Sequence, residues 1–156
     1  MEITMKVNTK KFGEIDLADD KLIHFTNGIV GFPQLTDFAL IHDGEKEDGP
    51  IRWLQSMQEP GFAMPVIDPL FVMEDYNPVV EEELLKDIEL EDEEELFVLV
   101  TLTVPKDIQK MSANLKAPFV INTRNKKACQ LIVEDDRCEV KFPVYEIFKG
   151  KKKAGE

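Results

Sequence analysis

The chain has 156 residues, of which 43% are hydrophobic and 32% charged, a composition that favours one globular domain over a disordered chain. Nineteen basic and 31 acidic residues give a net charge of −12, which opposes direct binding to nucleic acid and favours basic protein partners. No apolar run approaches the roughly 20 residues of a membrane helix, and the first residues lack the apolar stretch of a signal peptide. We therefore expect a cytoplasmic protein with no membrane contact.

Alternating apolar residues predict short strands in the first third of the chain, at residues 3–7 and, less regularly, at 21–25. Residues 27–33, NGIVGFP, contain two glycines and a proline and indicate a shaped connection between strands. A short apolar strand is expected at 38–41, and the polar residues 42–50 indicate a solvated loop after it.

Two runs, 51–57 (IRWLQSM) and 62–68 (FAMPVID), predict a β-hairpin whose four-residue connection fits a type I turn. In this register Gln55 pairs with Met64 and lies on a face of large apolar residues. That face consists of Ile51, Trp53, Met57, Phe62, Met64 and Val66. Gln55 either satisfies backbone groups at the end of a barrel or lies at the rim of a binding surface, and periodicity does not choose between these. Pro65 indicates an edge strand or a bulge.

One helix is clearly signalled after the hairpin. Asn77 can cap it, Pro78 fits the first helical position, and Glu81 to Glu83 lie where the helix dipole favours anions. The apolar stripe of this helix consists of Val80, Leu84 and Ile88. A second short turn of helix is expected at 107–111.

The remaining segments return to strands. Residues 96–104 are nearly all apolar or β-branched and predict a central strand buried on both sides, and residues 118–122 predict another. Many short strands with one or two short helices favour a mainly β fold, a small closed or pseudo-barrel of short antiparallel strands. We expect one β-rich domain over residues 1–148, followed by a flexible, lysine-rich tail over 149–156.

The two cysteines appear in a predicted last hairpin, which turns at residues 134–137 and pairs Cys138 with Val133 and Cys129 with Phe142. They share a face of this hairpin but lie about 13 Å apart at ~3.3 Å per residue, which is too far for a disulfide. We expect two buried thiols.

The motifs that bind cofactors or metals are missing from the sequence. It has no glycine-rich phosphate loop, and His24 and His42 are isolated, without zinc-ligand spacing. Residues 81–95 hold ten carboxylates and one lysine, a run more typical of a solvated face than of a catalytic site. We therefore expect no catalytic residue, cofactor or metal. A small acidic β-barrel that binds a ligand or acts as an enzyme through carboxylates stays open as an alternative, whereas the charge opposes a barrel that binds RNA directly.

Several stretches, taken in order, resemble one protein family. They are GIVGFP and DFALI, then IRWLQS and FAMPVIDP, then Tyr76 before the acidic helix, and finally SANLKAPFVIN with Gln130. From about Phe25 to Val144 they closely resemble FliW, the family of flagellar assembly factors. The resemblance implies a cytoplasmic protein that is not an enzyme and that binds flagellin and CsrA, the small basic RNA-binding regulator that represses flagellin translation. It also implies partner switching, in which accumulated flagellin takes up the FliW-like protein and releases CsrA.

Contact residues are expected in two places. For CsrA we expect the carboxylates after the hairpin, held by proline-containing turns, together with a tyrosine and the first acids of the helix. These residues are Asp68, Glu74, Asp75, Tyr76, Glu81 and Glu82. For flagellin, which we expect to dock a helix in a groove, we expect an exposed apolar surface that includes Phe32 and Leu70. The alternative is that both of these are core residues.

Overall fold

The computed structural model describes residues 4–9, 13–18, 22–42, 51–77 and 82–154. The strands are β1 Thr4–Thr9, β2 Gly13–Ala18, β3 Leu22–Phe25, β4 Asp37–His42, β5 Arg52–Ser56, β6 Ala63–Ile67, β7 Leu96–Thr103, β8 Ser112–Ala113, β9 Phe119–Asn122, β10 Lys127–Gln130 and β11 Phe142–Pro143. The helices are α1 Glu82–Leu85 and α2 Tyr145–Ala154, with the short 3-10 helices η2 Pro69–Phe71, η3 Lys86–Ile88, η4 Glu93–Glu95 and η5 Ile108–Lys110.

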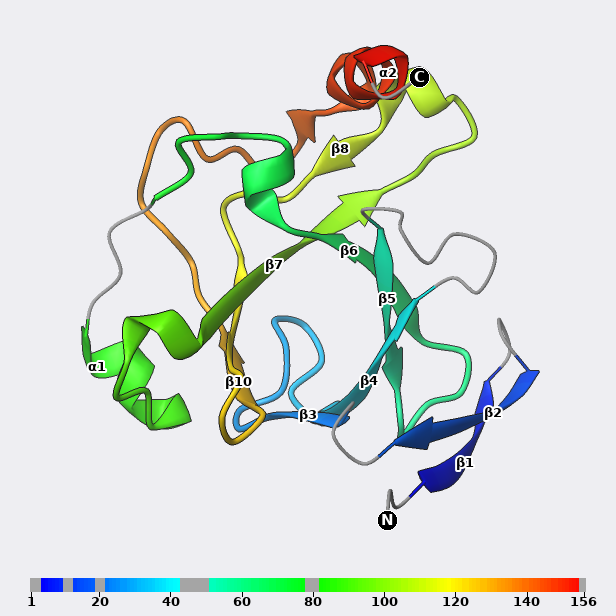
Figure 1. Ribbon diagram of the computed structural model, residues 1–156, viewed down its shortest axis with the longest axis vertical. Coiled ribbons are helices and arrows are strands. Elements are labelled where there is room, and N and C mark those ends of the chain that lie inside the picture. Colours follow the sequence, from blue (N-terminus) through cyan, green and yellow to red (C-terminus); the bar gives the residue numbers. More distant parts are fainter. Residues whose placement is uncertain (1–3, 10–12, 19–21, 43–50, 78–81, 155–156) are drawn as a thin grey trace.

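Seven of the strands close into a ring in the order β7, β6, β5, β4, β3, β10, β9 and back to β7 (Figure 1). Neighbouring strands are antiparallel except β3 and β10, which run parallel with His24 opposite Lys127. Closure pairs the strand edges that an open sheet would expose. The predicted small, mainly β barrel is therefore confirmed, with one parallel pair where only antiparallel pairs were expected.

The other strands lie outside this ring. β8 pairs with the end of β7, and β11 pairs with β8. The first two strands, β1 and β2, form a separate antiparallel hairpin in which Thr4 lies opposite Ala18. The first of these strands was expected from its alternation, whereas the second was not.

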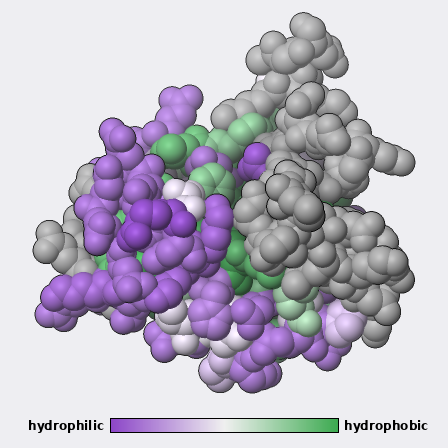
Figure 2. All heavy atoms as spheres, turned by 60° about the horizontal axis from the view of Figure 1, so that its bottom comes forward, coloured by the Kyte–Doolittle hydropathy of each residue, from purple (hydrophilic) through white to green (hydrophobic). Residues whose placement is uncertain are grey.

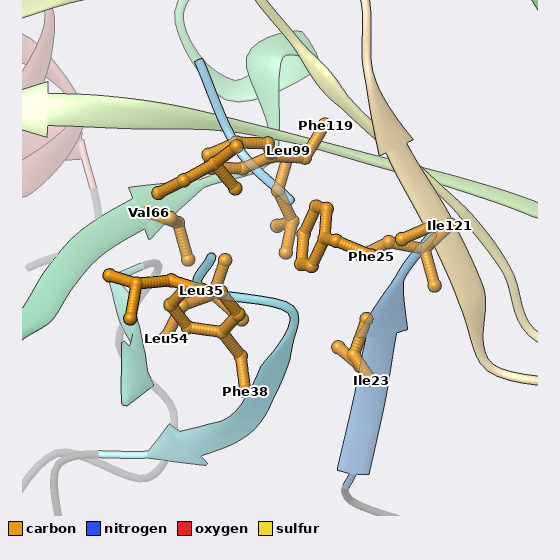
Figure 3. Packing of buried hydrophobic residues seen from close by; sticks show 11 residues of the cluster. Ile23, Phe25, Leu35, Phe38, Leu54, Val66, Leu99, Phe119 and Ile121 are labelled. Carbon is orange, nitrogen blue, oxygen red and sulfur yellow. The ribbon is translucent and has the colours of Figure 1, made fainter. Parts of the chain in front are cut away.

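The barrel core is built on three phenylalanines from segments far apart in the sequence (Figure 3). The ring of Phe25 meets that of Phe38 at a centroid distance of 5.4 Å and that of Phe119 at 5.2 Å, both nearly edge-on. All three side chains are almost wholly buried, and each contributes about 1.5–3 kcal/mol by leaving water. The same cluster contains Ile23, Ile29, Leu35, Leu54, Val66, Leu99, Ile121 and Ala128.

The hairpin of β5 and β6 forms, but its register differs by one residue from the predicted one. Gln55 lies opposite Ala63, and the amide of Ser56 donates to the carbonyl of Phe62 at 2.9 Å. The connection therefore covers residues 57–61, one residue more than the turn that the sequence suggested. A longer connection moves every cross-strand partner by one position.

The side of β5 that faces the barrel core is not the predicted apolar face. Leu54 belongs to the barrel core, whereas Trp53 and Met57 pack in a separate cluster on the other side of the sheet. That outer cluster is completed by Leu22, Ala39 and Ile41. Both sides of β5 are apolar, so period-two alternation alone could not identify the inward one.

Pro65 lies at a local strand edge, as predicted. β6 pairs with β5 through Pro65, but it pairs with β7 only at Val66 and Ile67. Beyond that point β7 pairs with β8 instead. The missing N–H of the proline therefore interrupts no hydrogen bond to β7.

The predicted last hairpin is wrong, because β10 pairs with β9 and β3 rather than with the segment that follows it. Residues 131–141 contain no described strand, and the amides of Leu131 and Val133 donate to the carbonyls of Pro118 and Lys116. Closure of the barrel places β10 between β3 and β9, so neither edge of β10 is free to pair with the segment that follows it. The two buried thiols are confirmed, but Cys129 and Cys138 lie in different clusters, as free cysteines.

The helical predictions are confirmed in part. η5 falls within the turn predicted at 107–111, and η3 with α1 falls within the helix predicted after Asn77. Residues 78–81, which include its expected N-terminus, and the loop 43–50 lie outside the described residues. β7 is buried at both Leu99 and Val100, which are on opposite faces, as expected of a central strand.

The last described helix, α2, crosses the expected domain boundary. It continues to Ala154, so its backbone is helical through the first part of the predicted tail 149–156. Near its start, Phe148 packs against Phe71 with ring centroids 5.1 Å apart. The division into a domain over 1–148 and a flexible tail stays a prediction.

The connection between β3 and β4 folds back across the barrel, inside the ring outlined by the strands in Figure 1. Ile29 and Leu35 from this connection join the barrel core, and the backbones of Ile29 and Phe32 bond to each other across a tight turn. Gly28 and Gly31 adopt φ values of 69° and 87°, a region that other residues enter only at a cost. The motif NGIVGFP is thus a plug for one end of the barrel.

The two glycines of this plug predict unequal effects of substitution. A Cβ at Gly28 would lie 2.4 Å from the carbonyl oxygen of Pro33, whereas a Cβ at Gly31 would meet nothing within 4 Å. Gly28→Ala should lower the free energy of unfolding by about 2–4 kcal/mol, because it adds a backbone clash to the strain of positive φ. Gly31→Ala should lower it by about 1 kcal/mol, from positive φ alone. Urea unfolding measures both, and equal losses would contradict the close packing of Gly28.

Candidate protein-binding surfaces

The carboxylates predicted to contact CsrA lie on and after η2. Asp68 caps η2, since its Oδ1 accepts a hydrogen bond from the amide of Leu70 at 2.9 Å, and Pro69 occupies the first position, where no N–H is needed. Glu74 and Asp75 follow in an exposed turn. Asp68 therefore lies in a short turn that contains a proline, as expected, whereas Glu74 and Asp75 lie in a turn without a described proline.

Arg137 joins this turn to a second acidic turn. Its Nη1 lies 2.6 Å from Oδ2 of Asp75, and its Nη2 lies 3.3 Å from Oδ2 of Asp135. The hydrogen bonds from Arg137 lower the pKa of Asp135 and keep it charged. Exposed pairs of this kind add little stability, but they hold the two turns side by side. We call Asp68, Glu74, Asp75 and Asp135 the acidic face.

Tyr76 does not belong to that surface. Its side chain is buried, and its hydroxyl donates to the carbonyl of Leu115 at 2.8 Å. Burial, with smaller contributions from Cys138 and Asp135, raises the pKa of Tyr76 well above its ordinary value. Its ring packs in the core beneath the acidic face and supports the turn from inside.

The acidic helix contributes less than expected to an open surface. Glu81 lies outside the described residues, and Glu82 is the first residue of α1. Further along, Glu89 pairs with Lys127, which lowers the pKa of that carboxyl, and Glu95 pairs with Arg124. Lys127 begins β10 and Arg124 lies in the turn before it, so part of the acidic run is neutralised where it meets the barrel.

Buried amide side chains hold this run in place. Asn122, which is fully buried, donates from Nδ2 to the carbonyl of Ile88 at 2.9 Å, and Asn125 donates to the same carbonyl at 3.1 Å. The oxygen of Asn122 accepts from the amide of Arg124. The asparagine that ends SANLKAPFVIN is thus an anchor for η3.

Gln55 also has a backbone role. It is fully buried, and its Nε2 lies 3.0–3.2 Å from the carbonyl oxygens of Ser56, Pro60 and Phe62. It therefore ties together the loop between β5 and β6, which is the first of the two roles that the sequence left open. Its place among apolar residues follows from the need to satisfy buried carbonyls.

The two apolar residues expected to contact flagellin are exposed, so the alternative that they belong to the core is wrong. Phe32 is 40% exposed and Leu70 is 52% exposed. Phe32 packs on Phe62 with ring centroids 4.9 Å apart and lines an open groove of about 390 Å³. Leu70 is not among the described residues that line this groove. The structure therefore does not bring the two residues into one groove.

We call this depression the turn groove, because the turn at Ile29–Phe32 forms one of its walls. The described residues that line it are Ile29, Val30, Phe32, Phe62, Met64, Thr101, Asn114, Lys116, Ala117, Phe119, Gln130, Ile132 and Val140. In Figure 2, hydrophilic residues cover much of the described surface, with apolar residues showing between them at the centre of the view. The sequence did not predict the groove, because its lining residues come from segments far apart in the sequence.

The described residues meet the requirements of neither a metal site nor a reactive thiolate. No three His, Cys, Asp or Glu side chains among them converge on a possible metal site. Burial raises the pKa of the Cys129 thiol to about 11 and also raises that of Cys138, which disfavours the reactive thiolate. Within the described part of the chain, no helix is long and apolar enough to cross a membrane.

Comparison with known proteins identifies relatives over nearly the whole chain. The family model described as FliW protein matches residues 6–144. The flagellar assembly factor FliW of Lachnoclostridium phytofermentans is 50% identical, covering 97% of this chain and 99% of that protein. The one from Lachnospira eligens is 46% identical, covering 93% and 97%. A crystal structure of the flagellar assembly factor FliW superposes with a TM-score of 0.81 at 26% identity, covering 90% of this chain and 96% of that chain.

The buried position of Tyr76 predicts two effects of Tyr76→Phe. At neutral pH the variant should lose about 1–2 kcal/mol of stability, because the carbonyl of Leu115 loses its donor. Above pH 10 the unfolded tyrosine ionises while the folded one stays protonated, so wild-type stability falls as the pH rises. The variant should show a shallower fall, measured by urea unfolding between pH 7 and 11. Tyr145→Phe, in the partly exposed start of α2, is the control, and identical slopes for the two variants would contradict the burial of Tyr76.

Proposed function

Since the chain belongs to the FliW family of flagellar assembly factors, we propose that it acts in the cytoplasm by binding two proteins in alternation, the RNA-binding regulator CsrA and flagellin. Binding to CsrA relieves the repression of flagellin translation. Accumulated flagellin then takes up the chain and releases CsrA, so that translation falls again. This cycle requires two competing binding equilibria and no catalysis or direct contact with nucleic acid.

Family membership is the observation that carries this proposal, since the match covers residues 6–144 and the relatives are flagellar assembly factors along almost their full length. The negative net charge of the chain supports the proposed binding of CsrA. A net charge of −12 attracts a small basic protein and speeds its association. The carboxylate of Glu74 is exposed and available for such a partner, and that of Asp75, although paired with Arg137, is also exposed.

The acidic face is the proposed contact for CsrA. Three of its residues, Asp68, Glu74 and Asp75, were expected from the sequence, and Asp135 is added from the structure. Glu81 and Glu82 stay in the proposal as neighbouring acids, whereas the buried Tyr76 acts only as a support. For flagellin we propose exposed apolar residues, with Phe32 and Leu70 as candidates. A small ligand-binding barrel or carboxylate enzyme is the alternative, but Asp75 and Asp135 are exposed to solvent or paired with Arg137 rather than directed into a cavity.

Calorimetric titration with CsrA, repeated with flagellin already bound, tests the proposal. We expect saturable binding of CsrA that bound flagellin abolishes. Glu74→Ala/Asp75→Ala should weaken CsrA binding about tenfold or more, because both exposed carboxylates lie on the proposed contact. Binding should also weaken as salt rises.

The matched control is Glu91→Ala/Glu94→Ala, which removes the same charge from exposed positions in the acidic run. It should change the CsrA affinity by less than about threefold. Equal losses for the two double variants would mean that net charge and not the acidic face governs binding. No heat with either partner would overturn the proposed function and revive the ligand-binding alternative.

A further inference from the structure

The turn groove is an apolar surface without a described partner. Four of its lining side chains are large, apolar and substantially exposed, namely Val30 at 62%, Phe32 at 40%, Ile132 at 54% and Val140 at 55%. The partly buried Phe62 and Met64 line the groove beside them. Apolar side chains gathered in one groove, rather than scattered singly, are typical of a protein-binding site.

The walls of this groove are held rigidly by side-chain hydrogen bonds. Oε1 of Gln130 accepts from the amide of Val30 at 2.7 Å, and its Nε2 donates to the carbonyl of Ala117 at 3.1 Å. Oδ1 of Asn114 accepts from the amides of Lys116 and Ala117 at 3.2 Å. A surface fixed before binding loses little conformational entropy on association.

The charge of the groove differs from that of the rest of the protein. In a chain with 31 acidic residues, Lys116 is the only charged residue among the described residues that line the groove, and none of them is acidic. Arg124, Lys127 and Arg137 each lie within ion-pair distance of a carboxylate. For the exposed Lys116 the described residues provide no such carboxylate. A basic partner is therefore disfavoured here, and an apolar partner that carries a carboxylate is favoured.

The backbone around the groove favours contact through side chains over the addition of a strand. The amides of Val30, Phe32 and Lys116 already donate to groups within the chain, as does the amide of Val133. These amides are not available to a partner strand, whereas an amphipathic helix needs only apolar contacts and its own internal hydrogen bonds.

We propose that the turn groove binds an amphipathic helix whose apolar face covers Phe32, Ile132 and Val140 and whose carboxylate meets Lys116. This inference rests on the proposed function and assigns the groove to flagellin, because the basic CsrA fits the acidic face instead. It separates the two earlier flagellin candidates, since Phe32 lies in the groove and Leu70 does not.

Charged substitutions in the groove test this assignment. Ile132→Asp and Val140→Asp should each weaken flagellin binding about tenfold or more, because each buries a carboxylate in an apolar contact. CsrA binding should change less than about twofold. Val104→Asp and Ile108→Asp, at residues 52% and 54% exposed and outside the groove, are the matched controls and should leave both affinities unchanged. Calorimetry measures binding, and urea unfolding verifies that each variant folds.

The outcomes separate the inference from the proposed function. If the wild-type chain binds flagellin and both groove variants bind it as tightly as the controls, the groove assignment is wrong and the proposed function stands. If the wild-type chain does not bind flagellin, both fail. If sedimentation shows a dimer that Ile132→Asp dissociates, the occupant is a second copy of the chain, and the assignment is overturned.

A charge reversal tests the carboxylate. Lys116→Glu should weaken flagellin binding about tenfold, and replacing the contacting Asp or Glu of flagellin by Lys should restore it. Lys116→Met, which keeps the apolar stem, should show a smaller loss that disappears at high salt. Unchanged binding by Lys116→Glu would overturn the carboxylate contact.

Discussion

Closure of the seven-stranded ring is the constraint on which the rest of this structure depends. Two long-range pairings complete it, the antiparallel pair of β7 with β9 and the parallel pair of β3 with β10. Because β10 must lie between β3 and β9, the chain after it cannot fold back as a hairpin and runs instead along residues 116–118. The segment 131–140 is therefore spread over the outside of the barrel, where it can contribute to two surfaces.

Local signals in the sequence predicted most strands but not their partners. Alternation and β-branched residues located β3, β4 and β7, and the proline of β6 correctly indicated a local edge. The register of β5 with β6 depended on one residue of loop length, which Gln55 and Ser56 determine through bonds to the loop carbonyls. These hydrogen bonds depend on the backbone conformation of the loop, which the sequence alone does not specify, so they could not be predicted.

The candidate surfaces were predictable to different degrees. The exposure of Glu74 and Asp75 follows from their charge and their place in a turn, whereas the buried position of Tyr76 involves a hydrogen bond to the distant carbonyl of Leu115. Gln130 illustrates the same limit. It resembled a family residue in the sequence, but its bond to Val30 joins positions 100 residues apart. A groove whose walls come from distant segments exists only after the barrel has closed.

The segment 131–140 gives the proposed partner switch a physical basis. Ile132 and Val140 line the turn groove, whereas Asp135 and Arg137 belong to or pair with the acidic face. Both surfaces therefore include residues of one segment of ten residues, which spans at most about 36 Å when fully extended. If both partners extend over this segment, they compete sterically for the space above it. Competition of this kind requires no conformational change in the barrel, which suits a rigid core of interlocked phenylalanines.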